Sequence, residues 1–522
     1  MKRLLWLPTL ALALALAACG GGGGSTIITP PPAGGFTLSS LKGNYAFSMS
    51  GMDPSSGAYF VRTGSFVADG AGNISSGLED VADLGATSPF GEVTFSGKYT
   101  MLANGRGTIV LTDSSGDPPL DWTMDLQSSS QGLLVETDGT FASSGSFNLQ
   151  NINDFTASNF NGNYVFDFSG ITLTGANVTN ISIIGNISAN GSGLITAGVL
   201  DSNDGNNGPS GPLALTVQGT YQLDPSYGAT FGRGIATFAG YSYAFYIVDN
   251  TRIKFIEEDT LGGSSGDAVL QSGAIPTTTA GFTGSFAYLV GGSSSSGVNA
   301  DAAVARFTAG AGGIGAISYD ENNAGTNNGD IHISQGSNIT NATYTIDSAG
   351  TGRGTFTFTD STGGTFSYVF YLVSPNSGVI QDVSSGIVAD GTLLAQSGSP
   401  FTLAGMAGSY VHNWNGVNNK SLNEEDFIAQ FTLASGSSNN ITGVLDGTVI
   451  GNGGNGYPDI GTQGTLTIAT DSTTNNTLTI VAGSPLSVTF NSVAYIVDAN
   501  TVLVLDTDKS NVLAGIVSRQ SQ

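Results

Sequence analysis

The chain has 522 residues, of which 77 are glycine and only 10 % are charged. Acidic residues outnumber basic ones by 39 to 14, and the resulting net charge of −25 disfavours binding to nucleic acid or to anionic lipid head groups. One cysteine and two histidines exclude a disulfide framework and leave little for zinc, thiolate or histidine-based catalysis.

The N-terminus has the order of a secretory signal. Lys2 and Arg3 precede a mostly apolar run, residues 4–15, that is too short to span a bilayer as a permanent helix. Leu16-Ala17-Ala18-Cys19 follows and resembles the lipobox of bacterial lipoproteins. The resemblance implies that residues 1–18 are removed as a signal peptide and that Cys19 is acylated, so that the protein is a lipoprotein that carries palmitate. The alternative is an ordinary signal peptide that ends by chance on a cysteine.

The residues after the cleavage site predict a tether. In bacterial lipoproteins an Asp after the cysteine favours the inner membrane, so Gly20 implies the outer membrane or the cell surface. Residues 19–40 are rich in Gly and Pro and contain nothing that could build a core, which predicts a lipidated linker of roughly 25 Å as a random coil. Without the signal peptide, 12 basic residues face 39 acidic ones, a net charge of −27.

The remaining chain predicts an all-β protein. Thr, Val, Ile, Tyr and Phe alternate with glycine-rich turns, and no long stretch places apolar residues at helical spacing. A chain without disulfides needs sizeable cores, so we expect domains of more than roughly 80 residues each.

Four copies of one unit follow one another along the chain. Each opens with an apolar residue, a glycine and an aromatic residue, and the shared glycines are Gly43, Gly162, Gly284 and Gly408. The first three copies close on Gln150, Gln271 and Gln396. These recurring residues divide the chain into repeats at residues 41–150, 160–271, 282–396 and 406–519. We expect the repeats to be separate domains arranged one after another, like beads on a string.

Turn residues divide each repeat into about eight strands. In the first repeat the expected strands are residues 44–50, 61–68, 73–80, 92–101, 107–112, 120–127, 133–137 and 146–150. All connections are short, so neighbouring strands should pair antiparallel in chain order and form small up-and-down β-barrels. The alternative is a β-sandwich, which usually carries longer Greek-key crossovers.

The Gly-x-aromatic tripeptide that opens each first strand weakly resembles the Gly-x-Trp of lipocalins and avidins, which are eight-stranded ligand-holding barrels. Tyr or Phe stands in place of the Trp, and no matching Arg follows on the last strand. The resemblance supports a barrel and transfers no ligand.

Three polar positions return from copy to copy. An Asp closes the third expected strand, an Arg between two glycines opens the fifth, and acidic residues end the seventh. These are Asp80, Asp201, Asp320 and Asp446; Arg106, Arg233 and Arg353; and Glu136 with Asp138, Glu257 with Asp259, Asp382, and Asp506 with Asp508. The fourth copy has Asn476 in the region of the Arg.

Two interpretations of these positions are open. The first is scaffolding at the barrel ends, in which an Asp accepts turn amides and an Arg bonds a carboxylate of its own repeat, Glu136 or Asp138 for Arg106. The second makes the seven Asp and Arg residues candidate binding residues for a small ligand or a cation at each barrel mouth.

The composition favours a non-catalytic protein. His332 and His412 do not recur between copies, and no nucleophile, zinc or phosphate-loop motif occurs. We therefore expect a cell-envelope lipoprotein for surface binding, adhesion or spacing, held to the membrane by its lipid, with no cofactor, no metal and no nucleic-acid partner. Its surface partner is unknown, and the repeats can pack on one another. The alternatives are an array of lipocalin-like barrels that bind small ligands and a carboxylate-dependent hydrolase.

Overall fold

A computed structural model describes residues 35–521 except 115–118, 175–176, 296, 298, 311–312, 325–329, 335–338, 361–362, 419–422, 437, 451–454 and 470–475. The expected signal peptide, Cys19 and most of the tether lie outside the described residues.

The first repeat is a closed antiparallel barrel in which β1 pairs with both β2 and β8. Its strands are β1 (Lys42–Asp53), β2 (Ala58–Asp69), β3 (Asn73–Asp83), β4 (Phe90–Tyr99), β5 (Arg106–Asp113), β6 (Leu120–Ser128), β7 (Gln131–Glu136) and β8 (Ala142–Leu149). All eight predicted strands are present. The hairpin between β2 and β3 turns on Gly70 and Gly72, whose positive φ angles of 79° and 102° favour glycine.

In the second and third repeats the fourth strand is divided in two. The second contains β9 (Asn161–Thr174), β10 (Asn177–Asn190), β11 (Leu194–Asp204), β12 (Gly208–Ala214), β13 (Gly219–Leu223), β14 (Arg233–Phe238), β15 (Tyr241–Asp249), β16 (Arg252–Glu257) and β17 (Gly262–Leu270). The third contains β18 (Gly284–Ser294), β19 (Ala300–Gly310), β20 (Gly313–Asn323), β21 (Asp330–Ser334), β22 (Thr340–Ile346), β23 (Arg353–Thr359), β24 (Thr365–Ser374), β25 (Ser377–Asp382) and β26 (Ile387–Ala395). The second closes through a β10–β11 pairing, and the third is nearly closed.

The fourth repeat is again a closed barrel of eight strands. These are β27 (Gly408–Asn418), β28 (Glu424–Leu433), β29 (Asn440–Val449), β30 (Asn455–Thr467), β31 (Asn476–Ala482), β32 (Thr489–Asp498), β33 (Thr501–Asp506) and β34 (Asn511–Arg519). The all-β prediction of four antiparallel meanders is confirmed. The pairing of first with last strand makes them barrels and not sandwiches, because it leaves no second sheet.

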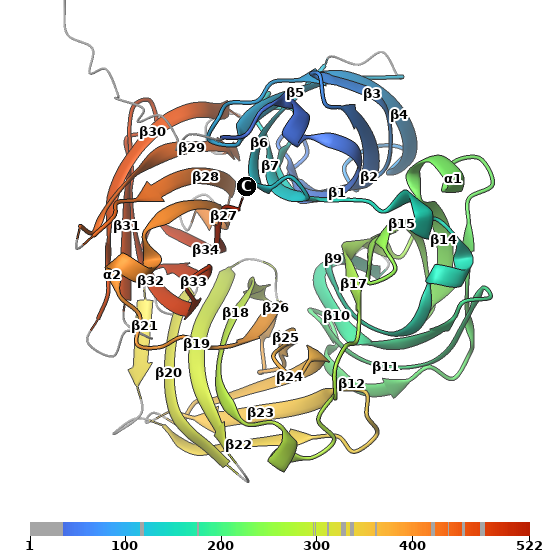
Figure 1. Ribbon diagram of the computed structural model, residues 1–522. Coiled ribbons are helices and arrows are strands. Elements are labelled where there is room, and N and C mark those ends of the chain that lie inside the picture. The colour runs from blue at the N-terminus through green and yellow to red at the C-terminus, as the bar shows by residue number, and fades with distance from the viewer. Residues whose placement is uncertain are drawn as a thin grey trace, which may run out of the picture.

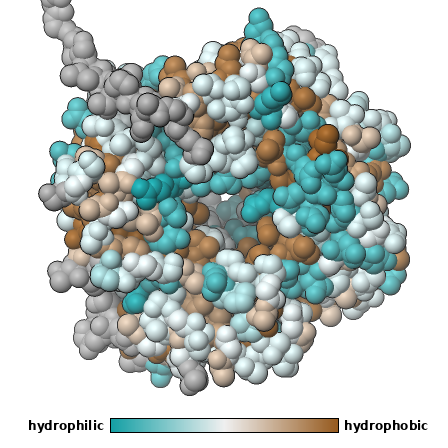
Figure 2. All heavy atoms as spheres, in the orientation of Figure 1, coloured by the Kyte–Doolittle hydropathy of each residue, from teal (hydrophilic) through white to brown (hydrophobic). Residues whose placement is uncertain are grey.

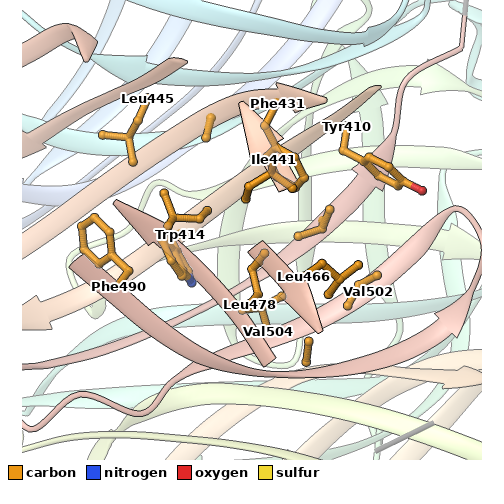
Figure 3. Packing of buried hydrophobic residues seen from close by; sticks show 14 of the residues in the cluster. Tyr410, Trp414, Phe431, Ile441, Leu445, Leu466, Leu478, Phe490, Val502 and Val504 are labelled. Carbon is orange, nitrogen blue, oxygen red and sulfur yellow. The ribbon is translucent and has the colours of Figure 1, made fainter. Parts of the chain in front are cut away.

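Each barrel is filled by its own side chains. Figure 3 shows the core of the fourth repeat, in which Tyr410, Trp414, Phe431 and Phe490 meet aliphatic side chains from the surrounding strands. A short helical turn before the first strand covers one end of each barrel. The turns are Leu38–Ser40, Ala157–Asn159, Thr279–Gly281 and α2 (Leu403–Met406). In the first three repeats a core tyrosine hydroxyl donates to a backbone carbonyl of this turn.

The four barrels form a ring and not an open string (Figure 1). On the faces where two repeats meet, strand residues that point away from a barrel core are buried as well, because they pack on the neighbouring repeat. In β15, Tyr243 and Phe245 lie in the core of the second repeat, whereas Tyr246 and Val248 pack with Ala46 and Leu78 of the first. The fourth repeat contacts the third on one side and the first on the other, which closes the ring.

Candidate functional site

The recurrent Arg and Asp residues meet across the interfaces between repeats. Arg233 at the start of β14 donates from Nε and Nη2 to both carboxylate oxygens of Asp80 on β3, at 2.9 and 2.7 Å. Arg353 makes the same two bonds to Asp201 of the second repeat, at 2.7 and 2.8 Å. In each case the Arg belongs to the later repeat and the Asp to the preceding one. All four side chains are at least nine-tenths buried.

Arg106 closes this series around the ring. It bonds Asp446 of the fourth repeat with the same two-pronged geometry, at 2.7 and 2.6 Å, and its Nη1 lies 2.8 Å from the exposed carboxylate of Asp459. The expectation that Arg106 pairs with Glu136 or Asp138 is therefore wrong. Those residues belong to the same barrel as Arg106, and Glu136 is 3.3 Å from Arg62 instead.

A tyrosine supports three of these carboxylates. The hydroxyls of Tyr246 and Tyr371 each donate to the Asp of the preceding repeat at 2.7 Å, and that of Tyr495 donates to Asp320. At the position that has Asn476 in place of Arg, the amide stays within its own repeat and donates to the carbonyl of Ala494 at 3.1 Å. In the fourth repeat, therefore, Tyr495 makes the contact to the preceding Asp.

The first repeat has Asp125 where the other repeats have these tyrosines, opposite Arg106 in the strand register. Asp125 is fully buried, and neither of its carboxylate oxygens has a hydrogen-bond partner. Burial, and next the nearby charge of Asp446, raise the pKa of Asp125 well above its usual range.

The glutamine that ends each repeat forms a second recurring contact. The amide of Gln150 donates to the carbonyls of Phe231 and Ile247 in the next repeat, and that of Gln271 to the carbonyls of Thr351 and Leu372. Gln396 reaches the carbonyl of Ile496 in the fourth repeat. Gln520 completes the circle by donating to the carbonyls of Asn104 and Leu126 in the first repeat, at 2.9 and 2.7 Å.

The recurrent acids of the seventh strand have two roles. Asp138, Asp259 and Asp508 accept backbone amides of their own hairpins. The buried residues of the pattern are Glu136, Glu257, Asp382 and Asp506, and each is the last residue of its strand. Burial raises the pKa of Glu136, Glu257 and Asp506 to about 8 and that of Asp382 to about 6. They are buried acids within the barrels.

The interior of the fourth barrel offers little room. A cavity in the core of the fourth repeat, lined by residues such as Tyr410, Phe431 and Leu478, has a volume of about 20 Å³. That volume corresponds to about one water molecule. A larger pocket lies outside the barrels, where the first, second and fourth repeats meet.

Sequence reasoning identified the recurrent Asp and Arg positions but not their partners, and it missed the tyrosines, Asp125 and Gln520. The sequence carries a signal for Gln520, because it follows Gln396 by 124 residues, close to the spacing of the other repeat-ending glutamines. The candidate ligand role of the Asp and Arg residues stays a prediction, since their polar atoms are used in contacts between repeats.

Comparison with known protein families and with curated proteins gives no match. Within the described ranges, no helix has the length and apolar character needed to cross a bilayer. In the same part of the chain, no group of three or more His, Cys, Asp or Glu side chains is placed to hold a metal ion.

Proposed function

We propose that this protein is a non-catalytic lipoprotein of the cell envelope whose ring of four barrels is a rigid platform for binding or spacing. The observation that carries the proposal is the use of the recurrent polar residues. In the described part of the chain, most of the recurrent Asp, Arg and Gln positions connect one repeat to the next. A repeated pattern that builds a ring supports a mechanical role.

The filled barrels support this choice over a lipocalin-like array. A ligand of drug size needs a pocket of about 300 Å³ or more, and the cavity in the core of the fourth barrel is far smaller. The buried acids at the ends of the seventh strands also argue against a hydrolase of the carboxylate-pair type. Such enzymes place two carboxyl groups on either side of a substrate cleft, whereas these side chains are packed inside the barrels.

The lipid anchor rests on the Leu16-Ala17-Ala18-Cys19 sequence. Two or more acyl chains on Cys19 would hold the ring stably at a membrane, because each buried CH₂ contributes about 0.8 kcal/mol. Residues 20–40 would separate the ring from the lipid surface.

Expression of the full chain with radioactive palmitate tests the proposal. Cys19→Ser should abolish labelling and release the protein from the membrane fraction, whereas Ser25→Ala in the tether should leave both unchanged. Labelling that persists in Cys19→Ser would contradict the lipid anchor. Hydrolysis of envelope glycans that is lost in a Glu257→Gln variant would contradict the non-catalytic role.

A further inference from the structure

The ring encloses a pocket that belongs to no single repeat. Its volume is about 310 Å³, and its walls come from the first, second and fourth repeats. Figure 2 shows the centre of the ring hollowed, with hydrophilic residues gathered beside the opening. The polar part of the wall includes Gln127, Gln131, Asn148, Arg252, Asn413 and Ser518.

Several of these polar groups are free to bind a ligand. The side chains of Gln127, Gln131 and Asn148 are half-buried, and none of them bonds another side chain or backbone group in the described part of the chain. Elsewhere in the ring the repeat-ending glutamines are fully engaged with backbone carbonyls. Each free amide supplies both donors and an acceptor to the pocket.

The charge of the wall points to a neutral ligand. The guanidinium of Arg252 is already bound to Asp267 at 2.5 Å, and Lys254 lies 3.2 Å from the same carboxylate. Among the described residues that line the pocket, Arg252 alone is charged, and its charge is balanced by Asp267. The wall therefore offers no unbalanced charge to an anion or a cation, whereas its amides can bond hydroxyl groups.

The wall also has an apolar part. Leu133, Val411 and Ile516 lie beside the amides in the same pocket. A ligand that carries both hydroxyl groups and C–H surface matches such a wall. The amides can bond its hydroxyl groups, and the aliphatic side chains can cover its C–H surface.

We propose that this central pocket binds a neutral, hydroxyl-rich ligand, of the chemical class of a sugar residue in an uncharged glycan. The site goes beyond the platform role, because it depends on ring closure and not on the lipid anchor. It exists only where the first and fourth repeats meet, so its ligand would also stabilise the closed ring.

Titration calorimetry of the full chain in detergent tests the site. The neutral probes are maltotriose, cellotriose, chitotriose and mannotriose, with trigalacturonate as the anionic probe and spermidine as the cationic one. We expect at least one neutral trisaccharide to bind at least tenfold more tightly than either charged probe. The double variant Gln131→Leu with Asn148→Leu should weaken that binding at least tenfold.

Gln222→Leu is the matched control, because Gln222 is an exposed glutamine on β13, outside the pocket. It should bind the trisaccharide as the wild type does, and unchanged thermal unfolding would show that the double variant is folded. Absence of binding by all four neutral probes would overturn the proposal, as would tighter binding of trigalacturonate or spermidine or an equal loss in Gln222→Leu. None of these results depends on palmitate labelling of Cys19, so the site and the lipid anchor can fail separately.

Discussion

The interface between the third and fourth repeats and the interface between the fourth and first repeats, here called the closing interface, hold equivalent barrels by different means. The former buries a cluster of apolar side chains that includes Leu289, Val304, Tyr495, Leu503 and Leu505. At the closing interface, no cluster of buried apolar side chains joins the two repeats within the described residues.

The closing interface consists of polar contacts. Arg106 bonds Asp446, Ser144 donates to Asp426 at 2.5 Å, and Asn104 donates to Gln430 at 3.1 Å. Several buried acids accompany them, and burial raises the pKa of Glu425 and Asp426 to about 7. These contacts are directional, so they fix the orientation in which the first and last repeats meet. The comparison teaches that an apolar cluster holds each pair of repeats that are neighbours in sequence, whereas the closing interface depends on polar contacts.

The largest expected effect comes from Arg106→Ala. The substitution leaves the carboxylate of Asp446 buried without its charge partner, and breaking a buried pair in this way costs about 3–5 kcal/mol. Urea unfolding should show the loss, and small-angle scattering should show a larger radius if the ring opens. Lys42→Ala removes the same charge from an exposed position and should change neither measurement. Wild-type stability in Arg106→Ala would refute the importance of the pair.

Leu505→Ala probes the apolar interface. Leu505 is fully buried between the third and fourth repeats, and truncation of a buried leucine costs about 2–5 kcal/mol. We expect about 3 kcal/mol by urea unfolding, with little change between pH 5 and pH 8. Val481→Ala, at a valine that is 46 % exposed, is the control. A strong pH dependence of the Leu505→Ala effect would remove the contrast between the two interfaces.

Gln520→Ala should weaken the closing interface while leaving all of its charged residues in place. The variant leaves the carbonyls of Asn104 and Leu126 without their amide donor, which should cost about 1–2 kcal/mol. Limited proteolysis should then cleave the chain faster near the closing interface than in the wild type. Equal cleavage rates would mean that the glutamine contact is dispensable for closure.

Asp125→Asn tests whether a buried acid makes the stability of the ring depend on pH. Burial and the charge of Asp446 raise the pKa of Asp125 above its unfolded value near 4, so the folded state holds this proton more tightly. The resulting stabilisation is complete below about pH 4 and is lost as the pH rises towards the folded pKa.

This group should therefore make the wild type lose stability between pH 5 and pH 8, and Asp125→Asn should lose less stability over that interval. Asp121→Asn on the same strand is the comparison variant: burial and the charge of Asp138 also raise the pKa of Asp121, but its side chain is exposed, so its pH profile should change less. Parallel pH profiles for Asp125→Asn and the wild type in urea unfolding would contradict the raised pKa of Asp125. His412, whose pKa burial lowers to about 4, acts in the opposite direction and is common to all variants.

The barrels were predictable because their signals are local. Alternating apolar residues and glycine turns gave the strand order of the first repeat, and Arg106 does begin the fifth strand. The third strand continues three residues beyond Asp80, because that side chain points out of the barrel to Arg233 and need not end the strand. Recurrence between copies could locate these residues but not join them.

The partners could not be predicted because they lie far apart in the chain. Arg233 and Asp80 are 153 residues apart, and Arg106 and Asp446 are 340 apart. No periodicity tells whether a recurrent Arg meets the Asp of its own copy or that of the preceding one. Asp125 was accessible in principle, because alignment of the sixth strands places it with Tyr246, Tyr371 and Tyr495.

Ring closure through Arg106 and Gln520 fixes the number of copies. In an open solenoid the end copies need polar caps, and copies can be added or lost one at a time. Here every repeat has both of its interface faces covered by a neighbour, so the ring has no free face to accept a fifth barrel. Recombination that removed or duplicated one copy would change the angle at which every pair of neighbouring barrels must meet, so closure through these contacts favours four copies.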